Sequence, residues 1–261
     1  MRTNKMRSLL SQGKPVFGTM LQELRSPAVP MLMANLGFDF LFLDMEHGPY
    51  SMETAVDLIK VMRLAGLTAL VRVPADEYHL IARVLDAGAE GIMVPRVETR
   101  EQVERIVRFA KYPPVGDRGC SVFKGHNDFR KSDMLEFTRQ ANQENLTIIQ
   151  VERRRAIEDI EDLISVPGVD AAIIGPNDLA LSYGVAEDLS NPVLVEALQR
   201  VVDACRKHGR WSGMHVGNVA ALKAWMAKGM RIITYWTDLD MLATAPVKGL
   251  AELREAGTAL S

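Results

Sequence analysis

The sequence has few cysteines, no long apolar run and no marked excess of one charge. Only two cysteines occur among 261 residues, Cys120 and Cys205, far apart and outside any metal-type spacing. This argues against a disulfide scaffold and predicts a reducing, cytoplasmic setting. No apolar stretch approaches the roughly 18 residues of a membrane span, and the N-terminus has no apolar core of signal-peptide length. We therefore expect a cytoplasmic protein with no membrane partner.

The charged residues are nearly balanced, with 31 Lys and Arg against 33 Asp and Glu and a formal net charge of −2. That balance argues against a nucleic-acid partner, which requires a basic footprint, and against a polybasic membrane anchor. Hydrophobic residues make up 48% of the chain, enough for a sizeable core. The expected ligand is a small molecule.

Short apolar segments with a strand-like composition alternate with longer amphipathic segments that have helical spacing. Eight such strand-then-helix units in about 260 residues predict a closed parallel barrel better than an open sheet. We expect the α/β class, a (β/α)8 TIM barrel, with residues 1–261 as a single domain. The predicted strands are Val16–Leu21, Phe38–Leu43, Ala69–Val73, Gly91–Pro95, Thr147–Val151, Ala171–Ile174, Trp211–Met214 and Arg231–Tyr235.

The connection between the fourth and fifth predicted strands is unusually long. It begins with a helix whose first residues, Thr99 and Gln102, have the spacing of a capping box. A long loop that includes residues 117–130 follows, and an additional helix is expected from Ser132. Loops of this length in a compact domain are usually functional.

Polar residues follow several of the predicted strands, at the barrel end where (β/α)8 enzymes carry their chemistry. Because they come from different strands, we expect their side chains to converge on one rim. They are Asp44, Glu46 and His47 after the second strand, Arg72 in the third, Gln150 and Glu152 at the fifth, Asn177 and Asp178 after the sixth, and His215 after the seventh.

Each of these residues also has a structural explanation. Asp178 could be a helix N-cap, and Gln150 and Glu152 would be ordinary if their side of the strand faced solvent. A lone His47 is more often structural, whereas a buried Arg72 is rare unless it is paired. Taken together, carboxylates, an amide, an arginine and a histidine at one mouth favour Mg²⁺ or Mn²⁺ with a small oxo-acid.

Several longer motifs resemble the HpcH/HpaI aldolase/citrate lyase family of class II, metal-dependent aldolases. They occur in family order, cover nearly the whole chain and read FDFLFLDMEHGPYS, ALVRVP, VLDAGAEGIMVPRVET, YPPVGDRG and IIQVERRRAIEDIEDLISVPGVDAAIIGPNDLALSYG. The resemblance implies an aldehyde-lyase that reversibly cleaves a 4-hydroxy-2-oxo acid to pyruvate, or a related 2-oxo acid, and an aldehyde. The reaction would pass through a metal-stabilised enolate.

The resemblance also implies catalytic roles for individual residues. In DMEHGPY, His47 resembles the proton-transfer histidine, and in VRVP, Arg72 resembles the arginine that stabilises the enolate. Asp86, in LDAGAEG, resembles the carboxylate that raises the basicity of the histidine. The structural explanation of Asp86 is that it is a solvated carboxylate on a helix. Asp44 is expected to orient the histidine as well.

For the metal, the resemblance points to Glu152 in QVERR and Asp178 in GPNDL as ligands of Mg²⁺ or Mn²⁺, with Co²⁺ as a further candidate. It also implies a homo-oligomer, a hexamer of paired barrels, in which a neighbouring subunit helps to shape the site. The expected substrate contacts are Gln150, Gly175, Pro176 and Asn177.

Three segments depart from the family pattern, and they concern the aldehyde pocket. In MEHGPYS, Gly48 and Tyr50 replace the commoner alanine and asparagine. Asn177 stands where many members have a small residue. The usually Gly- and Ala-rich segment after DRG here reads CSVFKGHNDFR. It offers Lys124, His126 and Arg130 to a second carboxylate or a polyol, although a solvated loop is the simpler explanation for each residue alone.

Other reactions fit the sequence less well. A Schiff-base aldolase needs a lysine at a strand end, whereas the lysines here lie near turns, on helices or in the long loop. The seventh and eighth strand ends lack a Gly-rich phosphate site. Two alternatives remain open: a citrate- or malyl-type condensation through the same enolate, and a non-catalytic barrel that binds a metal and an oxo-acid.

Overall fold

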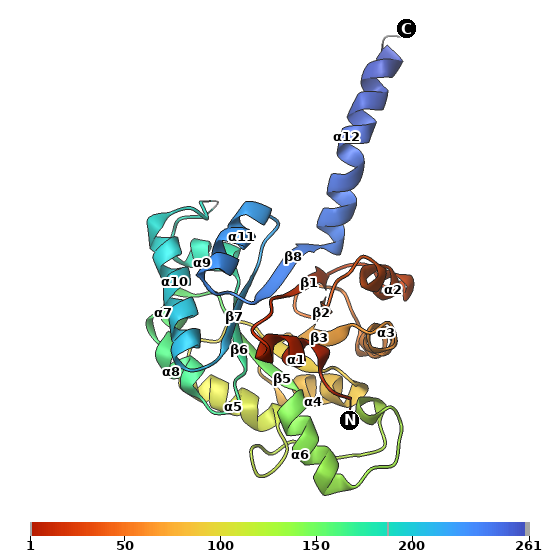
Figure 1. Cartoon of the computed structure of the whole chain (residues 1–261), viewed down its shortest axis with the longest axis vertical. Coiled ribbons are helices and arrows are strands. Elements are labelled where there is room, and N and C mark those ends of the chain that lie inside the picture. The colour runs from red at the N-terminus through yellow and green to blue at the C-terminus, as the bar shows by residue number, and fades with distance from the viewer. Residues whose placement is uncertain (1, 187, 259–261) are drawn as a thin grey trace.

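The computed structural model describes residues 2–186 and 188–258, in which eight parallel strands form a closed barrel with β8 paired to β1 (Figure 1). This confirms the predicted (β/α)8 fold. Residue 1, residue 187 and residues 259–261 of the predicted domain lie outside the described residues. The strands are β1 (Val16–Leu21), β2 (Phe40–Asp44), β3 (Thr68–Arg72), β4 (Gly91–Val94), β5 (Leu146–Val151), β6 (Ala171–Ile174), β7 (Trp211–His215) and β8 (Ile232–Thr237).

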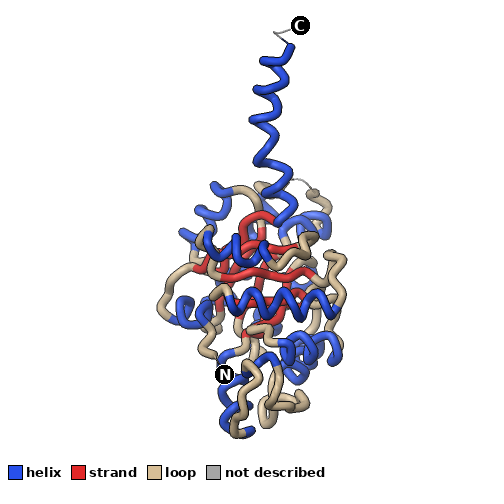
Figure 2. The backbone as a smooth tube through the Cα atoms, turned by 90° about the vertical axis from the view of Figure 1, so that its right-hand side faces the viewer, coloured by secondary structure: helices blue, strands red, loops and turns tan. Residues whose placement is uncertain are grey.

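Helices surround the barrel, so that the strands form the centre of the molecule (Figure 2). Met6 and Leu10 of α1 join the cluster inside the barrel, so α1 covers the end where the strands begin. The helices are α1 (Lys5–Ser11), α2 (Ala28–Asn35), α3 (Met52–Leu64), α4 (Tyr78–Ala87), α5 (Arg100–Ala110), the 3₁₀ helix η1 (Gly125–Asn127), α6 (Met134–Glu144), α7 (Arg154–Glu158), α8 (Ile160–Ser165), α9 (Pro176–Ser182), α10 (Pro192–Lys207), α11 (Val219–Lys228) and α12 (Asp238–Thr258).

The connection between β4 and β5 holds the expected loop and additional helix. Thr99 and Gln102 form the predicted capping box at the start of α5. The additional helix is α6, with Asp133 as its N-cap. The loop before it contains η1 and packs its residue His126 against Phe137 of α6, with ring centroids 4.7 Å apart.

Alternation along the strands separates two apolar layers. In β2, Phe40 and Phe42 point into the barrel, whereas Leu41 and Leu43 pack between the barrel and the helices. The strand extends one residue beyond the predicted Leu43, because Asp44 pairs in register with Arg72 of β3. Asp44 is therefore the third inward position of β2, directly above the interior of the barrel.

The last helix, α12, projects away from the barrel (Figure 1). Its 21 residues include a proline, Pro246. Among the described residues, no helix combines the length and apolar character needed to cross a membrane. Several large apolar side chains of α12 are exposed: Leu239, Leu242, Val247, Leu250 and Leu253.

Candidate active site

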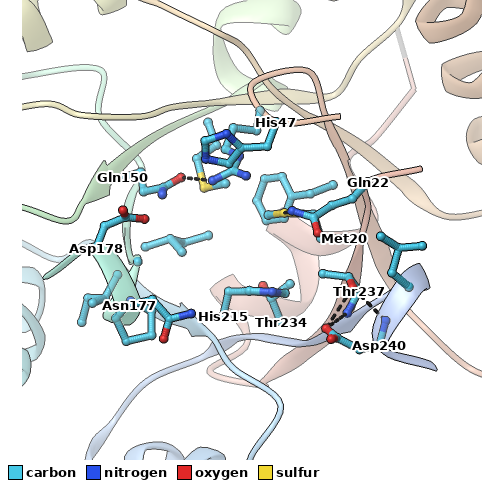
Figure 3. A pocket seen from close by; sticks show the side chains of 18 residues that line it. Met20, Gln22, His47, Gln150, Asn177, Asp178, His215, Thr234, Thr237 and Asp240 are labelled. Atoms are coloured by element: carbon cyan, nitrogen blue, oxygen red, sulfur yellow. Dashed lines mark hydrogen bonds between the residues drawn. The ribbon is translucent and has the colours of Figure 1, made fainter. Parts of the chain in front are cut away.

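The inward positions of neighbouring strands change from apolar to polar as the strands approach their carboxyl ends. In β2 the order is Phe40, Phe42, Asp44, and in β3 Leu70 precedes Arg72. This change opens a cavity of about 350 Å³ above the packed interior (Figure 3). Its polar lining residues are Gln22, His47, Arg72, Gln150, Asn177, Asp178, His215, Thr234, Thr237 and Asp240.

Arg72 and Asp44 form a buried two-point ion pair. Nε and Nη2 of Arg72 donate to Oδ1 and Oδ2 of Asp44 at 2.8 and 2.5 Å, and the two residues are 6% and 0% exposed. Burial raises the pKa of Asp44, but the hydrogen bonds and charge of Arg72 outweigh it, so this pKa lies below its ordinary value. The buried arginine is thus paired, and it carries a fixed positive charge into the cavity.

A chain of polar contacts leads from this pair to Glu152. Nη1 of Arg72 donates to Oε1 of Gln150 at 3.4 Å, and Nε2 of Gln150 donates to Glu152. The other Glu152 oxygen accepts the backbone N–H of Arg96 at 2.7 Å. Gln150 and Glu152 are 3% and 4% exposed, so the side of β5 that carries them faces the interior. The solvent-facing alternative is wrong.

The segment from Gly175 to Asp178 follows β6 and forms the start of α9. Gly175 is the N-cap residue, and no side chain of the described chain caps this helix, so Asp178 is not an N-cap. A Cβ atom on Gly175 would lie 2.9 Å from Oε2 of Glu152 and 3.0 Å from Nε2 of Gln150. The absence of a side chain at Gly175 thus leaves these polar atoms open to the cavity. Pro176 and Asn177 also line it.

His47 lies at the mouth of the cavity, with a side chain that is 61% exposed. Its Nε2 is 3.9 Å from Oε2 of Glu46. Asp44 accepts the backbone N–H groups of Glu46 and His47 at 3.0 and 3.3 Å, so it positions the backbone of this segment, not the imidazole. An exposed imidazole at a cavity mouth can exchange protons with both water and substrate.

Asp86 does not approach His47 within one chain. It lies near the end of α4, on the side of the barrel where β4 begins. There it pairs with Nη2 of Arg118 at 2.5 Å and lies 3.6 Å from Nδ1 of His126. It is therefore an ion-paired carboxylate and not a simply solvated one, and the 117–130 loop packs beside it, away from the cavity.

Glu46 was expected at the rim without a specific role, whereas Thr234 and Asp240 were not predicted as site residues. Glu46 has a side chain that is only 7% exposed, and it lies 3.3 Å from Nη1 of Arg72 and 3.2 Å from Nε of Arg96. Thr234 and Asp240 come from the eighth strand and the helix after it, where no polar pattern stood out. Their convergence depends on barrel closure.

The carboxylates at the mouth form a suitable setting for a divalent cation. A second hollow of about 330 Å³ is lined by Glu46, Glu152 and Asp178 among others. Burial raises the pKa of Glu152, and the negative charges of Glu46 and Asp178 raise it further, against the Arg96 hydrogen bond. Closely spaced carboxylates of this kind are relieved by a bound cation.

The donor set also indicates which kind of ion fits. In the described part of the chain, no group of three or more His, Cys, Asp or Glu residues is arranged to hold a metal. The two carboxylates proposed as ligands, Glu152 and Asp178, would therefore supply only part of a coordination shell. Mg²⁺ is commonly held in this way, by one or two carboxylates with water and substrate oxygens in the other positions. The residues therefore fit a hard, partly hydrated cation better than a fully protein-enclosed one.

His215 occupies the side of the cavity away from these carboxylates. Its pKa is lowered to about 4, chiefly by burial and then by the charge of Arg72, against the opposing effects of Asp240 and Asp44. Its Nδ1 is buried and has no hydrogen-bond partner among the described residues. At neutral pH this imidazole is therefore neutral.

The buried ion pair predicts a characteristic pattern of stability. Arg72→Ala should lower the free energy of unfolding by about 3–5 kcal/mol, since it leaves the Asp44 carboxylate buried without a counter-charge. Adding Asp44→Asn should recover part of that loss. Denaturant unfolding of both variants measures the coupling, with Arg100→Ala of an exposed pair as a control expected to change little. A double variant less stable than Arg72→Ala would contradict the prediction.

The neutral state of His215 predicts a pH effect. Between pH 6.5 and 4 the unfolded chain binds a proton at this histidine that the folded chain does not bind. The free energy of unfolding should therefore decrease as the pH is lowered from 6.5 to 4. His215→Asn should remove this contribution. Melting temperatures of metal-free protein from pH 7.5 to 4.5 test it, with His79→Asn on the surface as a matched control. An equal acid-induced decrease in wild type and His215→Asn would refute it.

Comparisons with known proteins agree with this architecture. The family model of HpcH/HpaI aldolase/citrate lyase matches residues 20–245. A hydroxypyruvate/pyruvate aldolase from Paraburkholderia phytofirmans is 33% identical over 260 residues, which cover 97% of this chain and 98% of that protein.

Two solved structures are similar over almost their full length. An HpcH/HpaI aldolase from Desulfitobacterium hafniense has a TM-score of 0.93 and 32% identity, over 97% of this chain and 98% of that one. A citrate synthase has a TM-score of 0.89 and 26% identity, over 98% and 100%. With a family match over most of the chain and a relative above 30% identity, this protein is a carbon–carbon lyase of the HpcH/HpaI aldolase/citrate lyase family.

Proposed function

We propose that this enzyme reversibly cleaves a 4-hydroxy-2-oxo acid to pyruvate, or a related 2-oxo acid, and an aldehyde. The observation that carries the proposal is the arrangement of Arg72, Gln150 and Glu152 as one connected polar wall, with Asp178 on the same side of the cavity as Gln150 (Figure 3). Such a wall joins a fixed positive charge to a cation-binding pair of carboxylates. Both are needed where an enolate develops.

In this proposal Glu152 and Asp178 hold Mg²⁺ or Mn²⁺, which when bound acts as a Lewis acid on the 2-oxo acid. Gln150 orients both neighbours, since its oxygen accepts from Arg72 and its nitrogen donates to Glu152. Asp44 is a positioning residue that holds the Arg72 guanidinium in one orientation. Gly175, Pro176 and Asn177 leave room for the 2-oxo acid and contact it.

During cleavage the proton of the substrate 4-hydroxyl group passes to the enzyme. The substrate 4-hydroxyl loses its proton, the C3–C4 bond breaks, and its electron pair passes into the enolate beside Arg72 while the aldehyde leaves. His47, at the mouth and in contact with solvent, accepts that proton directly or through water. The enolate then takes up a proton at C3, from His47 or from water, to give pyruvate. In the reverse direction pyruvate loses that C3 proton, the enolate carbon attacks the aldehyde, and His47 returns a proton to the new hydroxyl group.

A condensing reaction is the second candidate, and the similarity to a citrate synthase favours it. The same residues would stabilise the same enolate, which would then attack the keto group of a 2-oxo acid. Arg72, Glu152 and Asp178 would keep their roles, and only the electrophile would differ. A screen of aldehydes against 2-oxo acids as acceptors distinguishes the two reactions.

The enolate half of the reaction can be tested without knowing the acceptor. The pyruvate methyl group should exchange its protons in deuterium oxide with Mg²⁺ or Mn²⁺ present and should stop exchanging after chelation, as followed by proton NMR. Glu152→Gln should abolish exchange, because a cation ligand is lost. Arg72→Lys should slow it by roughly 10²-fold, since a planar two-point donor is lost.

Glu104→Gln, on the exposed face of α5, is the matched control for Glu152→Gln and should exchange at the wild-type rate. Absence of exchange in folded wild-type protein with Mg²⁺, Mn²⁺ or Co²⁺ would refute the pyruvate enolate. Exchange that persists in metal-free protein would refute the role of the two carboxylates.

We also propose that the chain assembles into a homo-oligomer, for which the family resemblance suggests a hexamer. The exposed apolar side chains of α12, which projects from its own barrel, support this. Asp86 could act on His47 only across a contact between subunits, so its proposed role depends on assembly. Two unpaired cysteines are consistent with a cytoplasmic setting.

Changes to α12 should therefore change the size of the particle. Light scattering should give a multiple of the 29.0 kDa chain mass for wild type. Leu250→Glu combined with Leu253→Glu should give smaller particles, because charged groups cannot be buried at the contact. Ala224→Glu on α11 is the control. A monomeric wild-type protein would contradict the proposal.

A further inference from the structure

Arg96, which follows the carboxyl end of β4, has a strained backbone beside the candidate cation site. Its φ is 55°, in the left-handed region, and it lines the same hollow as Glu152 and Asp178. A residue with a Cβ atom seldom adopts this region, because the Cβ then crowds a carbonyl oxygen. Such strain persists only where surrounding contacts fix it, and it is common at functional sites.

The backbone contact that fixes Arg96 is with Glu152 at the end of β5. The N–H of Arg96 donates to Oε1 of Glu152 at 2.7 Å, and Nε2 of Gln150 donates to Oε2 of the same carboxylate. The two donors occupy one lone pair on each oxygen and leave another on each oxygen free. Glu152 is buried, so water does not replace these bonds. The orientation of its carboxylate therefore depends on the strained N–H group of Arg96.

The side chain of Arg96 contacts a different carboxylate. Its Nε lies 3.2 Å from Oε1 of Glu46, and its Nη2 donates to the carbonyl oxygen of Pro74 at 3.0 Å. Oε2 of Glu46 lies 3.3 Å from Nη1 of Arg72. Glu46 is thus a counter-ion for two guanidinium groups. Because the Arg96 guanidinium is half-exposed, water screens its ion pair, and the buried bond to Glu152 is the contact that fixes the backbone.

We propose that Arg96 is a positioning residue for the divalent cation, because its left-handed backbone directs an N–H group at Glu152 and fixes the orientation in which that carboxylate binds the ion. This inference rests on the proposed cation-dependent function and deepens it. Arg96 does not contact the ion in this role and acts only through Glu152. Groups that orient a metal ligand commonly change metal affinity by about 10–100-fold when they are altered.

The test compares two variants of Arg96 that differ in backbone preference. Arg96→Gly keeps the N–H group and adopts a positive φ without strain, whereas Arg96→Val keeps the N–H group but disfavours that region strongly. Both lack the guanidinium group, so its loss cancels in the comparison. Mn²⁺ added to metal-free protein, with free Mn²⁺ followed by electron paramagnetic resonance, should bind Arg96→Val about tenfold more weakly than Arg96→Gly.

Two further pairs of variants accompany this comparison. Arg96→Asn and Arg96→Leu repeat it with side chains of similar size and less strain, since asparagine tolerates the left-handed region better than leucine. Phe129 also has a positive φ, of 57°, but lines neither hollow at the mouth of the barrel. Phe129→Gly and Phe129→Val should therefore differ in denaturant unfolding and not in Mn²⁺ affinity, which separates positioning from general stability.

Equal Mn²⁺ affinity in Arg96→Gly and Arg96→Val, or tighter binding by Arg96→Val, would overturn the proposal. Wild-type protein that binds no Mn²⁺, or binds it equally well after Glu152→Gln, would overturn the cation role of Glu152 and this inference with it. Failure of the proposed reaction alone is recognised separately. In that case Mn²⁺ affinity would still follow the backbone preference at Arg96, but the pyruvate methyl group would not exchange.

Discussion

The buried pair of Arg72 and Asp44 is the interaction on which the geometry of the site depends. The two residues are register partners on adjacent parallel strands, so barrel formation brings them side by side. Two hydrogen bonds fix the guanidinium plane, and the low exposure of both residues strengthens their attraction. Since removing either charge leaves the other buried, neither residue can change independently.

The rest of the polar network extends from this pair in two directions. Through Asp44 it reaches the backbone of Glu46 and His47 and the amide of Gln22, which donates to Asp44 at 2.9 Å. Through Arg72 it reaches Gln150, and from there Glu152. The pair thus sets the positions of groups that come from three different strands or strand ends. Rigid placement of this kind costs little reorganisation when charge develops on a substrate.

The cavity has two polar walls that differ in their electrostatics. One wall combines the positive charge of Arg72 with the carboxylates of Glu152 and Asp178. The other wall offers the neutral side chains of His215 and Thr234. The same burial that raises the pKa of Glu152 lowers that of His215, because low polarity disfavours the charged form of each.

The sequence by itself determined the barrel and most of the polar rim that contains Arg72. Alternating strands and helices predicted the (β/α)8 fold, and the carboxyl ends of the strands predicted the rim that gathers Arg72, Gln150 and Asp178. These features are local or follow from strand order, so they can be read from neighbouring residues. Residue roles taken from motifs remain predictions of function.

Only the tertiary structure decided which residues meet. It placed Asp86 with Arg118 and His126 at the far side of the barrel, although motif position linked it to His47. It also brought Thr234 from β8 beside His215 from β7, and among the described residues Oγ1 of Thr234 and Nδ1 of His215 have no hydrogen-bond partner. The partner of a side chain depends on closure of the barrel and on the path of a long loop, and neither is encoded in the spacing of residues along the chain.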